Sequence, residues 1–103
     1  MNVQKILKEA QKAQAKAALV QEKLAATELV GQAGNGLVEV TVNGHSEVLG
    51  IRIQPQAVDP EDVEALEDLV LVAIKTAQSQ ARARYEEEMN RELGSITGMM
   101  GGL

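Results

Sequence analysis

The sequence predicts an α+β fold in which two long helices are attached to a small antiparallel sheet. Residues 36–53 indicate the sheet, because two segments rich in β-branched residues flank a turn. Residues 3–26 and 60–93 are dense in helix-forming residues and flank this hairpin. The length of 103 residues fits one domain. We assign that domain to residues 1–93 and expect residues 94–103, rich in Gly and Met, to be a flexible tail.

The composition indicates a small core and favours a partner chain. Tyr85 is the only aromatic residue, so Ala, Val and Leu must fill the core, and they bury less area than an aromatic ring. Small domains bury apolar surface inefficiently, so we expect an obligate homo-oligomer. The absence of cysteine excludes disulfides, Cys-based zinc sites and thiol catalysis. We find no membrane span and no signal peptide, and we expect a cytoplasmic protein.

The helix predicted over residues 3–26 carries lysines on one side. At about 100° per residue, five lysines fall within an arc of roughly 80°: Lys5, Lys8, Lys12, Lys16 and Lys23. Apolar residues occupy the opposite, broader arc, although Leu19 lies among the lysines. One interpretation is a solvated helix face. The other is a surface that contacts phosphates, since a helix of roughly 35 Å can follow a duplex over several base pairs. The net charge of −5 opposes binding to a polyanion, so the choice between these two interpretations depends on the local electric field of the lysines.

The hairpin allows two registers. If residues 43–44 are the central turn residues, Val40 lies opposite Glu47. If residues 44–45 are central, with the glycine at positive φ in a type II′ turn, apolar residues pair on one face. We prefer this second register, which pairs Val40 with Leu49 and Val38 with Ile51.

Two short segments before the hairpin are less informative. Residues 27–32 are ambiguous and could form a first strand. Residues 33–36 form a glycine-rich turn that superficially resembles a phosphate-binding loop. No Lys-Ser/Thr pair follows it, and a strand comes next where that loop requires a helix, so we reject a P-loop.

The second helix is predicted to run from Pro60 to Leu93 and to end at Gly94. Six acidic residues in residues 59–68 fit helix capping and solvation, because their spacing is not that of a calcium loop. Residues 69–74 are apolar on every side of the helix, which predicts cover by a second subunit. We therefore assign a dimer interface to Leu69, Val70, Leu71, Val72 and Ile74.

The sequence contains no pattern of catalytic residues. His45 is the only histidine and lies in the predicted turn, with no nucleophile or acid at motif spacing. No set of residues has the spacing of a metal site, and we expect no cofactor and no small-molecule substrate. Binding is the remaining class of function, with nucleic acid or protein as the partner.

The chain resembles the YbaB/EbfC family of bacterial nucleoid-associated proteins. The central block carries most of the resemblance: GNGLVEVTVNG, the downstream LGIRI, and DPEDVEALEDLVLVAIKTA. The first helix (QKILKEAQKAQAKAALVQEKL) and the Met/Gly-rich tail also match. The resemblance implies an α-β-β-β-α protomer, with residues 27–32 as the first strand, and a tweezer-like homodimer with projecting helical arms.

The resemblance also implies binding to double-stranded DNA in the nucleoid, with little sequence specificity. Transferred to this sequence, the best phosphate contacts are Lys5, Lys8, Lys12 and Lys16, and the weaker candidates are Lys23, Arg82, Arg84 and Arg91. The alternative is a protein–protein adaptor that docks on replication or recombination machinery. The exposed Leu19 and the acidic surface favour this alternative.

Overall fold

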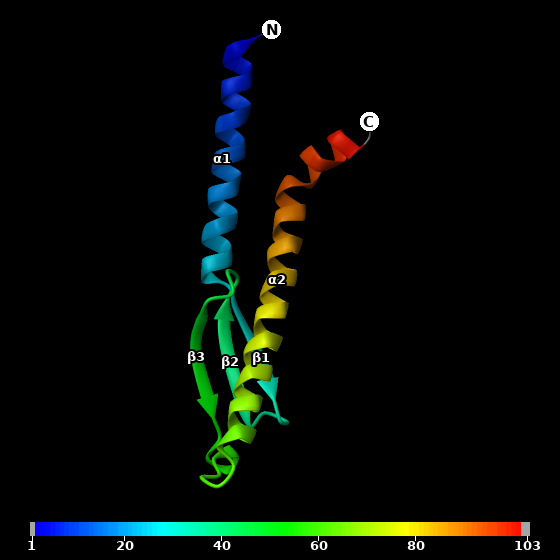
Figure 1. The fold of residues 1–103 in the computed structure, drawn as a ribbon. Helices are drawn as coiled ribbons and strands as arrows, with labels where there is room; N and C mark the ends of the chain where they lie inside the picture. Colours follow the sequence, from blue (N-terminus) through cyan, green and yellow to red (C-terminus); the bar gives the residue numbers. More distant parts are fainter. Residues whose placement is uncertain (1, 102–103) are drawn as a thin grey trace.

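A computed structural model describes the backbone of residues 2–101 and the side chains of residues 2–92. The elements follow the order α-β-β-β-α, which confirms the predicted α+β class (Figure 1). The first strand that the family resemblance implied over residues 27–32 is present and spans Glu28–Ala33, while Thr27 caps the preceding helix. The elements are α1 (Val3–Ala26), β1 (Glu28–Ala33), β2 (Val38–Asn43), β3 (Val48–Ile53), the 3₁₀ turn η1 (Pro55–Ala57) and α2 (Val63–Gly101).

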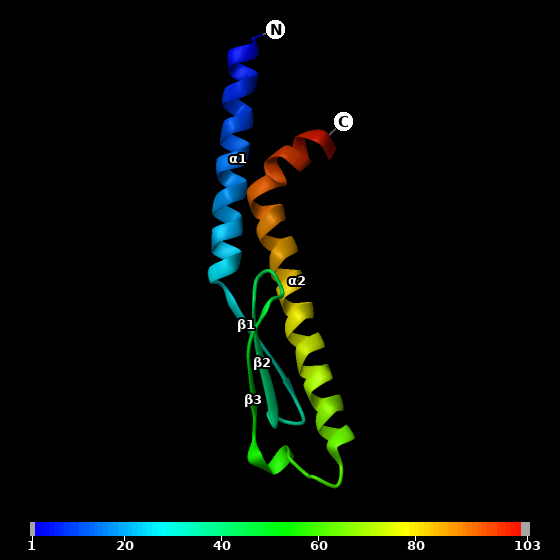
Figure 2. The same ribbon diagram turned by 60° about the vertical axis from the view of Figure 1, so that its left-hand side comes forward.

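The molecule is elongated, with extents of 71 × 26 × 16 Å. Helices α1 and α2 run in opposite directions, so the first part of α1 and the last part of α2 both extend beyond the sheet (Figures 1 and 2). Helix α1 begins where the Asn2 side chain accepts a hydrogen bond from the Lys5 amide at 3.3 Å. It ends at Thr27, whose hydroxyl donates to the Lys23 carbonyl at 2.6 Å.

The three strands form one antiparallel sheet in the order β1-β2-β3, so β2 is central. The preferred hairpin register is wrong by two residues, because Val40 lies opposite Ile51 and Val38 lies opposite Ile53. The other register, with Val40 opposite Glu47, is wrong as well. A shift of two keeps the same faces together, so apolar residues still oppose the β2 valines.

The hairpin turn explains the shift. The Asn43 amide donates to the Glu47 carbonyl at 3.0 Å, which leaves a three-residue loop between them. Ser46, and not Gly44, adopts the positive φ of this loop (66°). The Asn43 side-chain oxygen accepts from the amides of His45 and Glu47 at 2.9 and 3.1 Å, which holds the turn. An irregularity beside Thr41 completes the change of register.

Gly44 is required by a close approach between the turn and α1. Its amide donates to the Leu24 carbonyl at 2.8 Å. A Cβ at Gly44 would lie 2.7 Å from that carbonyl oxygen, which is closer than side chains allow. The turn between β2 and β3 therefore packs directly on the C-terminal end of α1 (Figure 1).

Both predicted ends of the second helix are wrong. It begins at Val63, not Pro60, because the Asp59 side chain accepts from Glu61 in a turn and Asp62 then accepts from the Ala65 amide at 3.2 Å. It continues through Gly94 to Gly101. A single glycine lowers helix stability by only about 1 kcal/mol, and no proline follows it. The flexibility of residues 94–103 and the domain limit at residue 93 stay predictions.

The core lies between β2 and one side of α2. Alternate valines of β2 are fully buried, and they pack against the small residues that recur every four positions on the helix. These residues are Val38, Val40, Val42, Ala73, Ala77 and Ala81. Alanine brings the helix backbone close to the sheet. The strand β3 lies outside this core, and all six of its residues are exposed.

Candidate nucleic-acid interface

Four lysines form a row on the free part of α1. We call Lys5, Lys8, Lys12 and Lys16 the lysine row; all four are exposed. In the part of the chain that the structure describes, none of the four forms an ion pair. At a rise of 1.5 Å per residue the row covers about 16 Å of helix axis. This length matches roughly five phosphates of one DNA strand at 3.4 Å each.

Lys23, the fifth predicted lysine, has a different environment. Its ammonium group donates to the Glu88 carboxylate at 3.0 Å and joins α1 to α2. The Glu88 side chain is buried, and it also accepts from Arg91 at 3.2 Å. The hydrogen bond from Lys23 lowers the pKa of the Glu88 carboxyl; burial opposes this effect, and the positive charges of Arg91, Lys23 and Arg84 add to it. The structure therefore places Lys23 at the base of the helical arm, as a structural contact.

Two of the three predicted arginines are also engaged with acids. Arg91 pairs with Glu87 at 3.0 Å, in addition to Glu88, and Arg84 lies 4.0 Å from Glu87. Such pairs reduce the field that these arginines present to a phosphate. Arg82 belongs to no ion pair among the described residues, and it lines a small pocket beside the hairpin turn.

The predicted dimer interface divides into two groups. Leu71 and Val72 are half exposed, at 50 and 51%. The other members, Leu69, Val70 and Ile74, are partly buried and pack against the core. The apolar segment of α2 is therefore only partly covered by its own chain.

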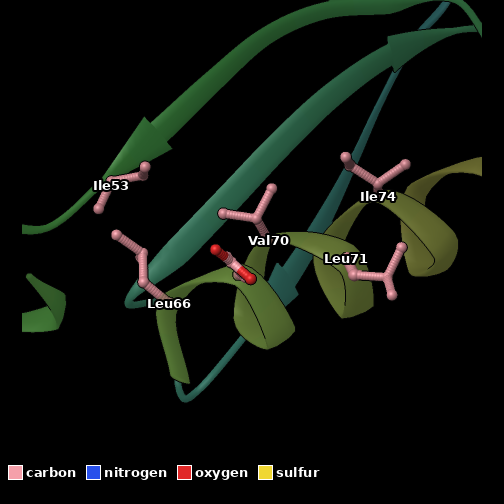
Figure 3. Close-up of a pocket in the computed structure, with 6 residues that line it drawn as sticks. Ile53, Leu66, Val70, Leu71 and Ile74 are labelled. Atoms are coloured by element: carbon pink, nitrogen blue, oxygen red, sulfur yellow. The ribbon is translucent and has the colours of Figure 1, made fainter. Parts of the chain in front are cut away.

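An apolar groove of about 510 Å³ lies between α2 and β3. In Figure 3 Ile53 from the strand faces Leu66 and Val70 from the helix. Glu67 is the one charged residue that lines it. Exposed apolar residues continue along β3 as Val48, Leu49, Ile51 and Ile53. These strand residues are not in the predicted dimer interface, although their apolar, largely β-branched pattern was a signal, because pairing within the hairpin was expected to account for them.

The described residues contain no group of three His, Cys, Asp or Glu side chains that could hold a metal ion. The His45 ring lies 3.2 Å from the Gln21 carbonyl oxygen, with Nε2 as the contacting atom. Within the same described part of the chain, no helix is long and apolar enough to cross a membrane.

Known proteins resemble this chain over its whole length. A statistical description of the YbaB/EbfC DNA-binding family matches residues 1–99. A nucleoid-associated protein of Thermus thermophilus is 53% identical over 100% of this chain and 99% of its own length. A nucleoid-associated protein of Streptomyces griseus is 46% identical over 98% of this chain and 85% of its own length.

A solved structure has the same fold. The crystal structure of an uncharacterized protein from Helicobacter pylori superposes with a TM-score of 0.63 at 20% sequence identity. The match covers 76% of this chain and 90% of that chain. At this identity the likeness concerns the fold alone.

Proposed function

Because the chain belongs to the YbaB/EbfC DNA-binding family, we propose that it is a nucleoid-associated protein that binds duplex DNA through phosphate contacts of the lysine row. Its relatives carry the name of nucleoid-associated proteins, which supports action at the nucleoid in the cytoplasm. Binding alters the conformation of the DNA and contributes to nucleoid organisation, gene regulation or DNA protection. The protein is not an enzyme in this proposal.

The lysine row is the observation that carries the proposal. Its four ammonium groups are exposed and free of ion pairs among the described residues, so they keep their full field towards a polyanion. Lysine is a point charge on a flexible stem, and phosphate contacts of this kind carry no sequence information. Binding is therefore largely independent of base sequence and strongly dependent on salt.

We infer a homodimer from the uncovered apolar surface. The groove between α2 and β3, together with the exposed strand β3, gives a continuous apolar surface that a second copy can cover. Strand β3 is also a sheet edge, whose unpaired backbone groups can be protected by a second chain. Two protomers joined there would each present an α1 arm, and the two lysine rows would flank one duplex.

The test is charge reversal within the lysine row. Lys8→Glu combined with Lys12→Glu removes two phosphate contacts per arm. At 50 mM salt each contact contributes about 10-fold to affinity, so we expect a loss of about 100-fold or more, measured by fluorescence anisotropy with a labelled duplex. Lys23→Glu is not a suitable control, because it would also break the ion pair between Lys23 and Glu88.

A better control is Lys75→Glu, a charge reversal at an exposed residue of α2 outside the row, compared with Lys8→Glu alone. Lys75 is exposed and belongs to no ion pair among the described residues, so the substitution leaves the core and the ion pairs of α2 intact. Sedimentation velocity on every variant checks that the oligomeric state is unchanged. Full duplex binding by the double variant would refute the proposed role of the row.

The adaptor function rests on a separate observation. Val3, Ile6, Leu7 and Leu19 are 50% or more exposed on α1. Such residues suit a protein partner that covers the arm. If Leu19→Asp abolished the protein's activity in the cell while the lysine substitutions left that activity intact, the adaptor would replace DNA binding as the better account.

A further inference from the structure

A small pocket of about 170 Å³ lies between the hairpin turn and α2, away from the lysine row. It brings together the only histidine and the only aromatic residue of the chain, which are 40 positions apart in sequence. Arg82 supplies a positive charge beside them, and no carboxylate among the described side chains lines the pocket. The lining residues are Gly44, His45, Ser46, Arg82 and Tyr85.

The walls of the pocket are held in place from three elements. Gln78 of α2 donates its side-chain amide to the Ser46 carbonyl at 3.2 Å, which ties the turn to the helix. The His45 ring contacts the Gln21 carbonyl of α1, and the His45 amide donates to the Asn43 side chain. Tyr85 keeps 38% of its surface exposed. A ligand therefore meets a preformed surface, which lowers the entropy lost on binding.

The chemistry of the lining is that of single-stranded nucleic-acid recognition. Unpaired bases stack on tyrosine and histidine rings and on the guanidinium plane of arginine, and arginine also binds phosphate. The amides of Gly44, His45 and Ser46 already donate to protein oxygens, so the side chains provide the contacts. We propose that this pocket binds one unpaired nucleotide of a single-stranded nucleic acid, with the base against Tyr85 and a phosphate at Arg82.

The volume agrees with a ligand of this size. Pockets for complete small molecules usually measure roughly 300–1,000 Å³. At about 170 Å³ this pocket accommodates only part of a longer chain, such as one base and its phosphate. Stacking is tolerant of base identity, so the site has little sequence preference. This inference goes beyond the proposed duplex binding, because duplex bases are already stacked on each other and do not reach Tyr85.

Tyr85 is a built-in reporter for this experiment. The chain has no Trp and no other Tyr, so intrinsic fluorescence reports the environment of Tyr85 alone. The full-length protein is titrated with an unlabelled ten-nucleotide oligothymidylate, with correction for absorbance. We expect saturable quenching, and Arg82→Gln should weaken the apparent affinity by about 5-fold or more. The control is Lys75→Gln, an equal charge change at an exposed residue of α2, which should leave the titration unchanged.

A second set of variants tests stacking. With a labelled oligothymidylate, Tyr85→Leu should weaken binding by about 5- to 150-fold, whereas Tyr85→Phe should preserve it. Duplex affinity of the same variants, measured in parallel, should stay unchanged, which separates this pocket from the lysine row. Absence of quenching, or equal losses from Arg82→Gln and Lys75→Gln, would overturn the proposal. Tyr85 emission that responds to protein dilution and not to the oligonucleotide would also overturn it, because a second copy would then cover the pocket.

Discussion

Gly31→Ala should separate β1 from α2. A Cβ on Gly31 would lie 2.4 Å from the Ala77 amide nitrogen and 2.5 Å from the Ala73 carbonyl oxygen. Both atoms belong to the helix backbone, so no side chain can rotate away. Ordinary van der Waals contact begins at 3.4 Å, and helix or strand must therefore move by about 1 Å. This movement also loosens the valine–alanine core on the same face.

The expected cost lies at the upper end for overpacked cores, about 3 kcal/mol. A urea titration monitored by far-UV circular dichroism measures it. With a slope of roughly 1–3 kcal/mol per molar urea, the unfolding midpoint should fall by about 1 M or more. All samples must share one protein concentration, since the stability of a dimer depends on it.

Gly50→Ala is the matched control. Gly50 lies in β3 without a positive φ, and a Cβ there meets nothing within 4 Å. Its substitution should be neutral or stabilise the strand by about 0.5 kcal/mol. If Gly31→Ala unfolded within about 0.5 kcal/mol of the parent while Gly50→Ala behaved as expected, the tight contact of β1 with α2 would be refuted.

Three further predictions concern the arm, the turn and the proposed dimer. Lys23 lowers the pKa of Glu88, so this carboxylate stabilises the fold above its ordinary pKa of 4.5 and the gain disappears as pH falls through the lowered value. Glu88→Gln should flatten the acid limb of a stability–pH profile, and an unchanged limb would contradict the linkage. Gly44→Ala should lower stability by about 1–3 kcal/mol in a denaturant titration, because its Cβ meets the Leu24 carbonyl; an unchanged midpoint would exclude that contact. If the proposed homodimer forms across the groove, Leu71→Asp should dissociate it in sedimentation equilibrium, and a dimer of parental affinity would remove the groove from the interface.

The elements of the fold that follow from a local periodicity of the sequence could be predicted. Alternating valines mark the buried face of β2 because strand side chains point to opposite faces in turn. The hairpin register could not be predicted, because a three-residue loop places Ser46 in a conformation that sequence rules assign to glycine. Gly44 was predicted to be a glycine because of its φ in the turn. A glycine is instead required there because the backbone of Leu24 lies too close for a Cβ, and this contact depends on tertiary packing.

The candidate site shows the same division. Helical spacing was sufficient to place the exposed lysine row on one side of α1. It also placed Lys23 on that side, and nothing local indicated a partner 65 residues away at Glu88. The pocket that joins His45 and Tyr85 likewise depends on how the turn packs against α2. Periodicity gives the face of a helix, and long-range packing decides which charges on that face are free.

The most direct test of duplex binding by the lysine row compares salt dependence between two proteins. The parent protein and Lys8→Gln combined with Lys12→Gln are titrated with a duplex of unrelated sequence over a salt series. For the parent, log Kobs should fall linearly with log salt, and the double variant should reduce the slope by about 1.8 for each engaged arm. A flat response, equal slopes for the two proteins, or no binding at low salt by an intact dimer would contradict the account.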